Sequence, residues 1–173
     1  MNNLDEVEEV ENFIVLLLGS DGHNVSEIFL QKELFILSNI DESLKLVFNF
    51  KKHYKGPYSD VVSSSLDSPL YLEDSFKLIN NQILLTEKGK KDFIKLSKDE
   101  KYKEIIPLLK FLRKIYERLS YEELLFLIYS TYPEYTEMSD IQEEIFKRDT
   151  KKRILNNLLR KGLITEERYE ELK

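Results

Sequence analysis

The sequence predicts a mainly helical fold with a small β-hairpin, in the α+β class. Two observations lead to this prediction. Apolar residues recur at helical spacing through most of the chain. Two short apolar runs, Phe76–Ile79 and Ile83–Thr86, stand on either side of Asn80-Asn81, which is the pattern of two strands joined by a tight turn.

The first helices follow from the spacing of the apolar residues. A helix is expected over residues 4–18, and the polar, glycine-containing segment 19–22 stops it. Asn24 and Glu27 have capping-box spacing, so a second helix is expected to begin there. A third short helix, or an extended segment, is expected over residues 42–48.

A basic aromatic loop, a further helix and the hairpin come next. The turn of residues 55–59 precedes a short helix that Ser59 or Asp60 is expected to cap. The hairpin follows, and Thr86 then opens another helix. Helices followed by a hairpin give residues 1–97 the order of a winged-helix-like domain. A helical bundle that carries an incidental hairpin is the alternative.

Residues 98–173 are expected to form a helical bundle or extension, which either stands alone or packs on the first part as one unit. Pro107 requires a break or a new helix start, and Pro133 ends a helix. Gly162 separates the last two short helices. Three pairs have capping-box spacing: Ser97 with Glu100, Ser120 with Glu123, and Ser139 with Gln142.

The composition excludes several kinds of site. The chain has no cysteine, two histidines and five scattered glycines. Disulfides, thiolate zinc sites, histidine-rich metal sites and glycine-rich phosphate loops are therefore excluded. Adjacent acids such as Glu122-Glu123 are more typical of a solvated helix face than of acid–base catalysis. We therefore expect a protein that is not an enzyme and needs no cofactor.

The same composition bears on location. The longest apolar run, Phe13–Leu18, is far shorter than the roughly 20 residues that span a bilayer. The N-terminal segment is acidic, whereas a signal peptide begins with basic residues. A soluble, cytoplasmic protein without membrane contact is expected. The abundance of Lys, Glu and Ile gives the chain a thermophile-like composition.

The charge is unevenly distributed. Residues 1–45 hold ten acids and two bases, and the remainder holds 22 acids and 24 bases. If a nucleic acid is bound, the acidic first helix has to face away from it. Lysine and arginine neutralise phosphates, and tyrosine stacks on nucleobases. The candidate nucleic-acid-binding residues are Lys51, Lys52, Tyr54, Lys55, Tyr58, Ser59, Lys88, Lys147, Arg148, Lys151, Lys152 and Arg153. In the alternative interpretation the bases are only solvated and the aromatic residues fill the core.

Three short motifs follow one another: Leu30-Gln31-Lys32, Gly56-Pro57-Tyr58-Ser59 and Leu85-Thr86-Glu87-Lys88-Gly89. In this order they resemble a family of small uncharacterised bacterial and archaeal winged-helix-like proteins, which is similar to the Panacea-type antitoxin domain. The segment 132–136, with Ser139 and Ile141, is similar to the later helical part of those proteins. The family usually has tyrosine before the second motif, where this chain has Lys55. The resemblance implies a regulatory or antitoxin-like role without catalytic residues.

Two functional hypotheses follow. The leading one is a non-catalytic regulatory protein that binds nucleic acid, DNA in particular, through a winged-helix-like domain. The competing one is a protein-interaction module, such as an antitoxin or a subunit of a complex, because the N-terminus is acidic and the last helices are amphipathic. A homodimer is compatible with either hypothesis.

Overall fold

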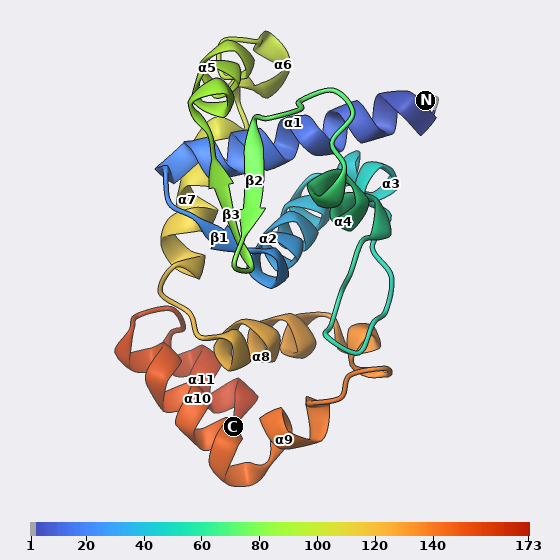
Figure 1. Ribbon diagram of the computed structural model, residues 1–173. Coiled ribbons are helices and arrows are strands. Elements are labelled where there is room, and N and C mark those ends of the chain that lie inside the picture. The colour runs from blue at the N-terminus through green and yellow to red at the C-terminus, as the bar shows by residue number, and fades with distance from the viewer. Residues whose placement is uncertain (1–2) are drawn as a thin grey trace. The chain divides into compact units, whose positions relative to one another are not determined.

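The computed structural model describes residues 3–173, and it confirms a mainly helical chain with a small antiparallel sheet (Figure 1). These residues form two compact units. Unit 1 comprises the residues up to Phe50 together with Ser59–Lys114, and unit 2 comprises Lys51–Tyr58 with Ile115–Lys173. The chain thus passes into unit 2 after Lys114, and the earlier segment Lys51–Tyr58 also belongs to unit 2.

Unit 1 is built around its first helix. Every side chain from Glu9 to Leu18 is buried, and this helix packs against α3, α4, α5 and β3. This stretch of α1 is therefore enclosed on all sides, whereas a typical surface helix buries only one face. In chain order the elements are α1 (Asn3–Asp21), β1 (Val25–Ser26), α2 (Glu27–Ile40), α3 (Leu44–Phe48), α4 (Asp60–Asp67), β2 (Phe76–Ile79), β3 (Gln82–Leu85), α5 (Glu87–Leu96), α6 (Glu100–Lys103) and α7 (Ile106–Tyr116), which runs on into unit 2.

The predicted hairpin is confirmed. Strands β2 and β3 pair antiparallel, with Ile79 opposite Gln82. Asn80 and Asn81 form the turn with φ of 51° and 61°. Asparagine tolerates this left-handed backbone better than most residues, which is why an Asn pair suits a two-residue hairpin turn.

A short third strand corrects the predicted start of the second helix. Val25 pairs with Ile83, so β1 lies on the free side of β3 and the strand order is β1-β3-β2. This long-range pairing holds the chain extended up to Ser26. The helix α2 therefore begins at Glu27, and Asn24 does not cap it.

Other helix starts agree with the sequence in part. The Ser59 hydroxyl caps α4 and the Thr86 hydroxyl caps α5, as predicted. The cap predicted at Ser97 is wrong, because Asp99 caps α6 instead. A new helix does begin beside Pro107, which confirms the predicted break.

Unit 2 is wholly helical apart from its loops. The capping box of Ser120 and Glu123 at α8 is confirmed. The one predicted at Ser139 is wrong, because α9 begins after Ile141 without a side-chain cap. The elements are α8 (Tyr121–Thr131), the 3-10 helix η1 (Pro133–Thr136), α9 (Gln142–Phe146), α10 (Arg148–Arg160) and α11 (Glu166–Leu172). The buried core side chains are Tyr116, Leu119, Leu124, Leu125, Phe126, Ile128, Tyr129, Ile145, Ile154, Leu155 and Leu158. Over residues 3–173, the structure contains no helix with the length and apolar character needed to cross a bilayer.

Candidate functional site

Residues of the first two short motifs, Gln31 and Ser59, meet at a buried contact in unit 1. The Gln31 side chain accepts a hydrogen bond from the Ser59 backbone N–H at 2.9 Å and donates to the Ser59 carbonyl at 3.0 Å. The Ser59 hydroxyl donates to the Phe48 carbonyl and accepts from Val62 N–H at 3.2 Å. Ser59 is fully buried, so this predicted site residue has a structural role.

The third motif fixes the start of α5. Lys88 Nζ donates to the Glu73 carbonyl at 2.6 Å and lies 3.3 Å from Asp92 Oδ2. A Cβ atom at Gly89 would lie 1.9 Å from the Ser75 carbonyl oxygen, so only glycine fits there. Lys88, another predicted site residue, is therefore committed to the fold around the hairpin.

The first basic cluster lies on a hairpin-like loop of unit 2. Lys51 and Tyr58 pair across it, with N–O distances of 2.8 and 3.0 Å. Between them, the ring centroid of His53 lies 3.9 Å from that of Tyr54 and 4.6 Å from that of Tyr58. The Lys55 ammonium lies 5.5 Å from the centre of the Tyr54 ring. Tyr58 thus stacks on a histidine of its own loop, and the Tyr54 ring contacts the same histidine at a tilt of 38°.

Polar contacts hold this loop to the residues that follow η1. Asp140 N–H donates to the Tyr54 carbonyl at 3.1 Å, and Lys52 Nζ lies 2.7 Å from Glu137 Oε1. A phosphate would have to compete with that carboxylate for Lys52. The loop therefore presents fewer available cations than its sequence indicates.

The second basic cluster begins at the start of α10, and carboxylates hold two of its five bases. Lys147 pairs with Glu144 on α9. Arg153 Nη2 lies 2.6 Å from Glu122 Oε2 on α8. These two bases join α10 to its neighbours, which leaves the other three as the candidates for an external anion.

Those three bases line a cavity of about 760 Å³ in unit 2. Within the described residues, no carboxylate lies within ion-pair distance of Arg148, Lys151 or Lys152. Four cations and a single carboxylate make this concavity attractive to anions. We call it the basic groove, defined by Phe146, Arg148, Asp149, Lys151, Lys152, Leu155, Tyr169 and Lys173.

Tyr169 and Lys173 did not stand out in the sequence. Tyr169 lies on α11 and Lys173 follows its last residue; α11 packs beside α10 (Figure 1). The Tyr169 hydroxyl donates to Asn156 Oδ1 of α10 at 3.0 Å. The only signal for them is that Gly162 and Thr165 separate a second short helix, which would fold back against the first.

The charge of unit 1 makes it a poorer site for phosphate. Unit 1 holds 13 bases and 19 acids, whereas unit 2 holds 13 of each. A cavity of about 580 Å³ in unit 1 is lined by five acids and only two lysines. An anionic ligand would be repelled there. These charged residues are Asp5, Glu8, Glu9, Asp92, Lys95, Asp99 and Lys101.

Two acids of α1 have structural roles. Glu11 is fully buried and accepts backbone N–H groups of residues 70–72 at 2.6, 2.9 and 2.7 Å. Glu9 accepts the Tyr102 hydroxyl at 2.6 Å, and burial with this contact raises the pKa of Tyr102. Part of the acidity of the N-terminal segment thus serves to anchor other segments to α1.

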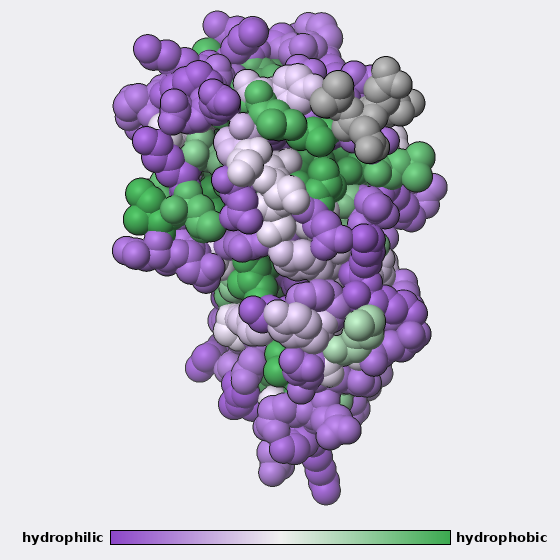
Figure 2. Space-filling view, turned by 45° about the vertical axis from the view of Figure 1, so that its right-hand side comes forward, coloured by the Kyte–Doolittle hydropathy of each residue, from purple (hydrophilic) through white to green (hydrophobic). Residues whose placement is uncertain are grey.

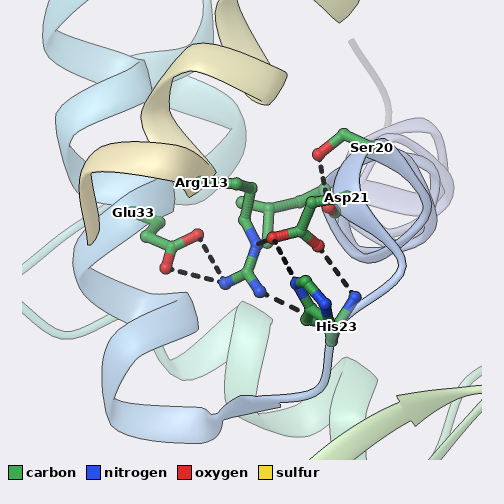
Figure 3. Close-up of polar contacts among 6 residues, drawn as sticks. Ser20, Asp21, His23, Glu33 and Arg113 are labelled. Carbon is green, nitrogen blue, oxygen red and sulfur yellow. Dashed lines mark hydrogen bonds and ion pairs between the residues drawn. The ribbon is translucent and has the colours of Figure 1, made fainter. Parts of the chain in front are cut away.

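A buried ion cluster joins three helices of unit 1 (Figure 3). Arg113 on α7 is 3% exposed; its Nε lies 2.9 Å from Asp21 Oδ2 and its Nη1 2.9 Å from Glu33 Oε1. Its Nη2 donates to the His23 carbonyl at 3.3 Å. Burial raises the pKa of Glu33 to about 7, although the guanidinium opposes this shift. Each nitrogen of the Arg113 guanidinium donates to an acceptor of the protein itself, so the cluster contributes to the packing of these three helices.

No protein-family model matches this chain, and no curated protein or solved structure matches it significantly. The geometry and the charge of the basic groove are therefore the features from which a function can be inferred.

Proposed function

We propose that this chain is a non-catalytic regulatory protein that binds nucleic acid through the basic groove of unit 2. The observation that carries the proposal is the set of three bases, Arg148, Lys151 and Lys152, that line a concavity without a carboxylate partner in the described part of the chain. Such bases lose no internal ion pair when a phosphate arrives, so counterion release by the phosphate favours binding.

In this proposal unit 1 has a winged-helix-like fold and contributes less to nucleic-acid binding than unit 2. Its element order, with a β1-β3-β2 sheet closing on a hairpin, supports that fold. In a helix-turn-helix domain the recognition helix contacts DNA through its exposed side chains. Here α4 precedes the hairpin, and it contains no base and exposes Asp60 and Asp67. That charge disfavours a duplex docked on α4.

The test is a titration of fluorescently labelled oligonucleotides with the full chain at several salt concentrations. Three phosphate contacts give a slope of about −2 for log K against log salt on a single strand, which is a loss of about 20-fold between 50 and 200 mM salt. The double variant Lys151→Gln/Lys152→Gln keeps one contact, so its loss over the same range falls to about 2- to 3-fold.

A matched control removes two lysines elsewhere. Lys90 and Lys91 on α5 are exposed and adjacent in the sequence, so Lys90→Gln/Lys91→Gln makes the same change of charge beside the hairpin. We expect this variant to keep the wild-type slope. Absence of binding to any oligonucleotide at tens of micromolar protein contradicts the proposal, and loss of binding only in the control would move the site to the hairpin.

Exposed apolar side chains favour a second candidate function, a protein-interaction module. Hydrophilic side chains predominate on the face in Figure 2, and hydrophobic ones form separate patches. Leu46 of α3 is 82% exposed, and Ile40 and Ile79 are each at least half exposed. Affinity capture with a Leu46→Lys variant beside the wild type tests this candidate, and sedimentation of the purified chain tests a homodimer.

A further inference from the structure

We propose that the basic groove accepts an unpaired nucleotide, so that unit 2 binds single-stranded nucleic acid in preference to a duplex. This inference rests on the proposed function and adds the form of nucleic acid to it. It is carried by the position of an aromatic ring, Tyr169, inside the same concavity as the three unpartnered bases.

The Tyr169 ring is held in place but not covered by another ring. Its hydroxyl is fixed by Asn156 at 3.0 Å, and its backbone N–H bonds to the Thr165 carbonyl. Across the described residues, no aromatic ring stacks on Tyr169. The other ring of the groove, Phe146, packs with its centroid 5.6 Å from that of Phe126. Tyr169 is therefore the ring on which a nucleobase can stack. Any nucleobase can stack on such a ring, because every one has a π-face.

The three basic residues lie on one face of α10, at a spacing suited to the phosphates of a nucleic-acid backbone. Arg148, Lys151 and Lys152 have i, i+3 and i+4 spacing, which places them on the same side of α10 within about 6 Å along its axis. The acids nearby are largely engaged: Glu170 lies 3.6 Å from Lys173 and Glu171 lies 2.7 Å from Arg168. Asp149 is the acid that lines the groove itself.

The shape of the site separates the two forms of nucleic acid. A volume of about 760 Å³ is in the range of cavities that enclose a small ligand. The nucleobases of a duplex are paired and stacked inside the double helix. A ring inside a groove, such as Tyr169, can stack on a nucleobase only after that nucleobase has been flipped out, at a cost of a few kcal/mol. An unpaired strand presents its phosphates and its base faces together.

The experiment compares a 15-nucleotide oligothymidylate, an oligouridylate of equal length and a 15-base-pair duplex, each titrated with the full chain in about 50 mM salt. We expect both single strands to bind at least about 10-fold more tightly than the duplex. Tyr169→Leu should weaken single-strand binding by about 5- to 150-fold, the range that one stacked base contributes. Duplex binding and the salt slope should not change, because no phosphate contact is removed.

Two variants separate stacking from folding. Tyr169→Phe keeps the ring and loses only the hydrogen bond to Asn156, so it should bind nearly as well as the wild type. Tyr169→Trp adds the only tryptophan, because the chain has none. Its fluorescence should be quenched by oligothymidylate and not by the duplex.

The outcomes distinguish the two proposals. Equal or tighter binding of the duplex, unchanged binding by Tyr169→Leu, or tryptophan fluorescence that does not respond to single strands overturns the preference for unpaired nucleotides and leaves nucleic-acid binding standing. Failure to bind any of the three probes overturns the proposed function as well.

Discussion

The buried cluster of Arg113, Asp21 and Glu33 predicts a dependence of stability on pH that one substitution should remove. One guanidinium faces two carboxylates, so the fully ionised cluster carries a net negative charge inside unit 1. Burial raises the pKa of Glu33 from 4.5 to about 7 because desolvation outweighs the attraction of Arg113. Glu33→Gln removes this titration and keeps an oxygen that accepts the Arg113 hydrogen bond.

The sign follows from proton uptake. A carboxyl whose pKa is higher in the folded state than in the unfolded state binds a proton on folding, so its contribution is fully present below pH 4.5 and is lost as the pH rises through about 7. A shift from 4.5 to about 7 corresponds to about 3 kcal/mol. Unlike the wild type, the Glu33→Gln variant should not lose this contribution.

Urea unfolding at pH 5, 6, 7 and 8 measures the effect. Other carboxylates titrate in both proteins, so the quantity to follow is the free energy of unfolding of the wild type minus that of Glu33→Gln. We expect this difference to fall by about 2.5 kcal/mol between pH 5 and pH 8, most steeply near pH 5.5–6, midway between the unfolded and folded pKa values of Glu33. A difference that stays constant or rises over this range would show that Arg113 keeps Glu33 ionised and would refute the reasoning.

Three further substitutions test other contacts of the fold. Glu123→Gln should be less stable than the wild type by an amount that is fully present above about pH 4.5 and shrinks as the pH falls below it, because desolvation raises the pKa of Glu123 but the hydrogen bonds from Lys161 and the Ser120 backbone N–H, with the charge of Lys161, together outweigh it and lower the pKa; urea titrations at pH 4 and 7 measure this. Glu11→Gln should cost about 3 kcal/mol in thermal unfolding, since a neutral amide cannot satisfy the three backbone N–H groups of residues 70–72. Gly89→Ala should cost about 2–3 kcal/mol because its methyl group meets the Ser75 carbonyl, whereas Lys90→Ala on the exposed side of α5 should change the unfolding free energy by less than about 0.5 kcal/mol.

Local signals predicted the fold where no distant segment intervened. Ser59 and Thr86 each cap the helix that their sequence context indicates, because a cap needs only residues within one turn. Asn24 has equally good spacing, but the pairing of Val25 with Ile83 keeps the chain extended. That partner lies 58 positions away, so no local pattern could reveal it.

The candidate site shows the same limit at the level of charge. The run of bases from Lys147 to Arg153 is evident in the sequence, and its pairing with Glu144 is a helix-spaced contact. The pairing of Arg153 with Glu122, 31 positions earlier, depends on how α8 and α10 pack. The sequence alone therefore could not predict which of these basic residues remain available to bind a phosphate.

The three short motifs and the basic groove belong to different parts of the chain. Gln31, Ser59 and Gly89 hold backbone segments of unit 1 together, and each is buried. The groove is formed by residues 146–173, which follow all three motifs in the chain. These three motif residues therefore bear on the packing of unit 1, and what the chain binds has to be inferred from the basic residues and the ring of α10 and α11.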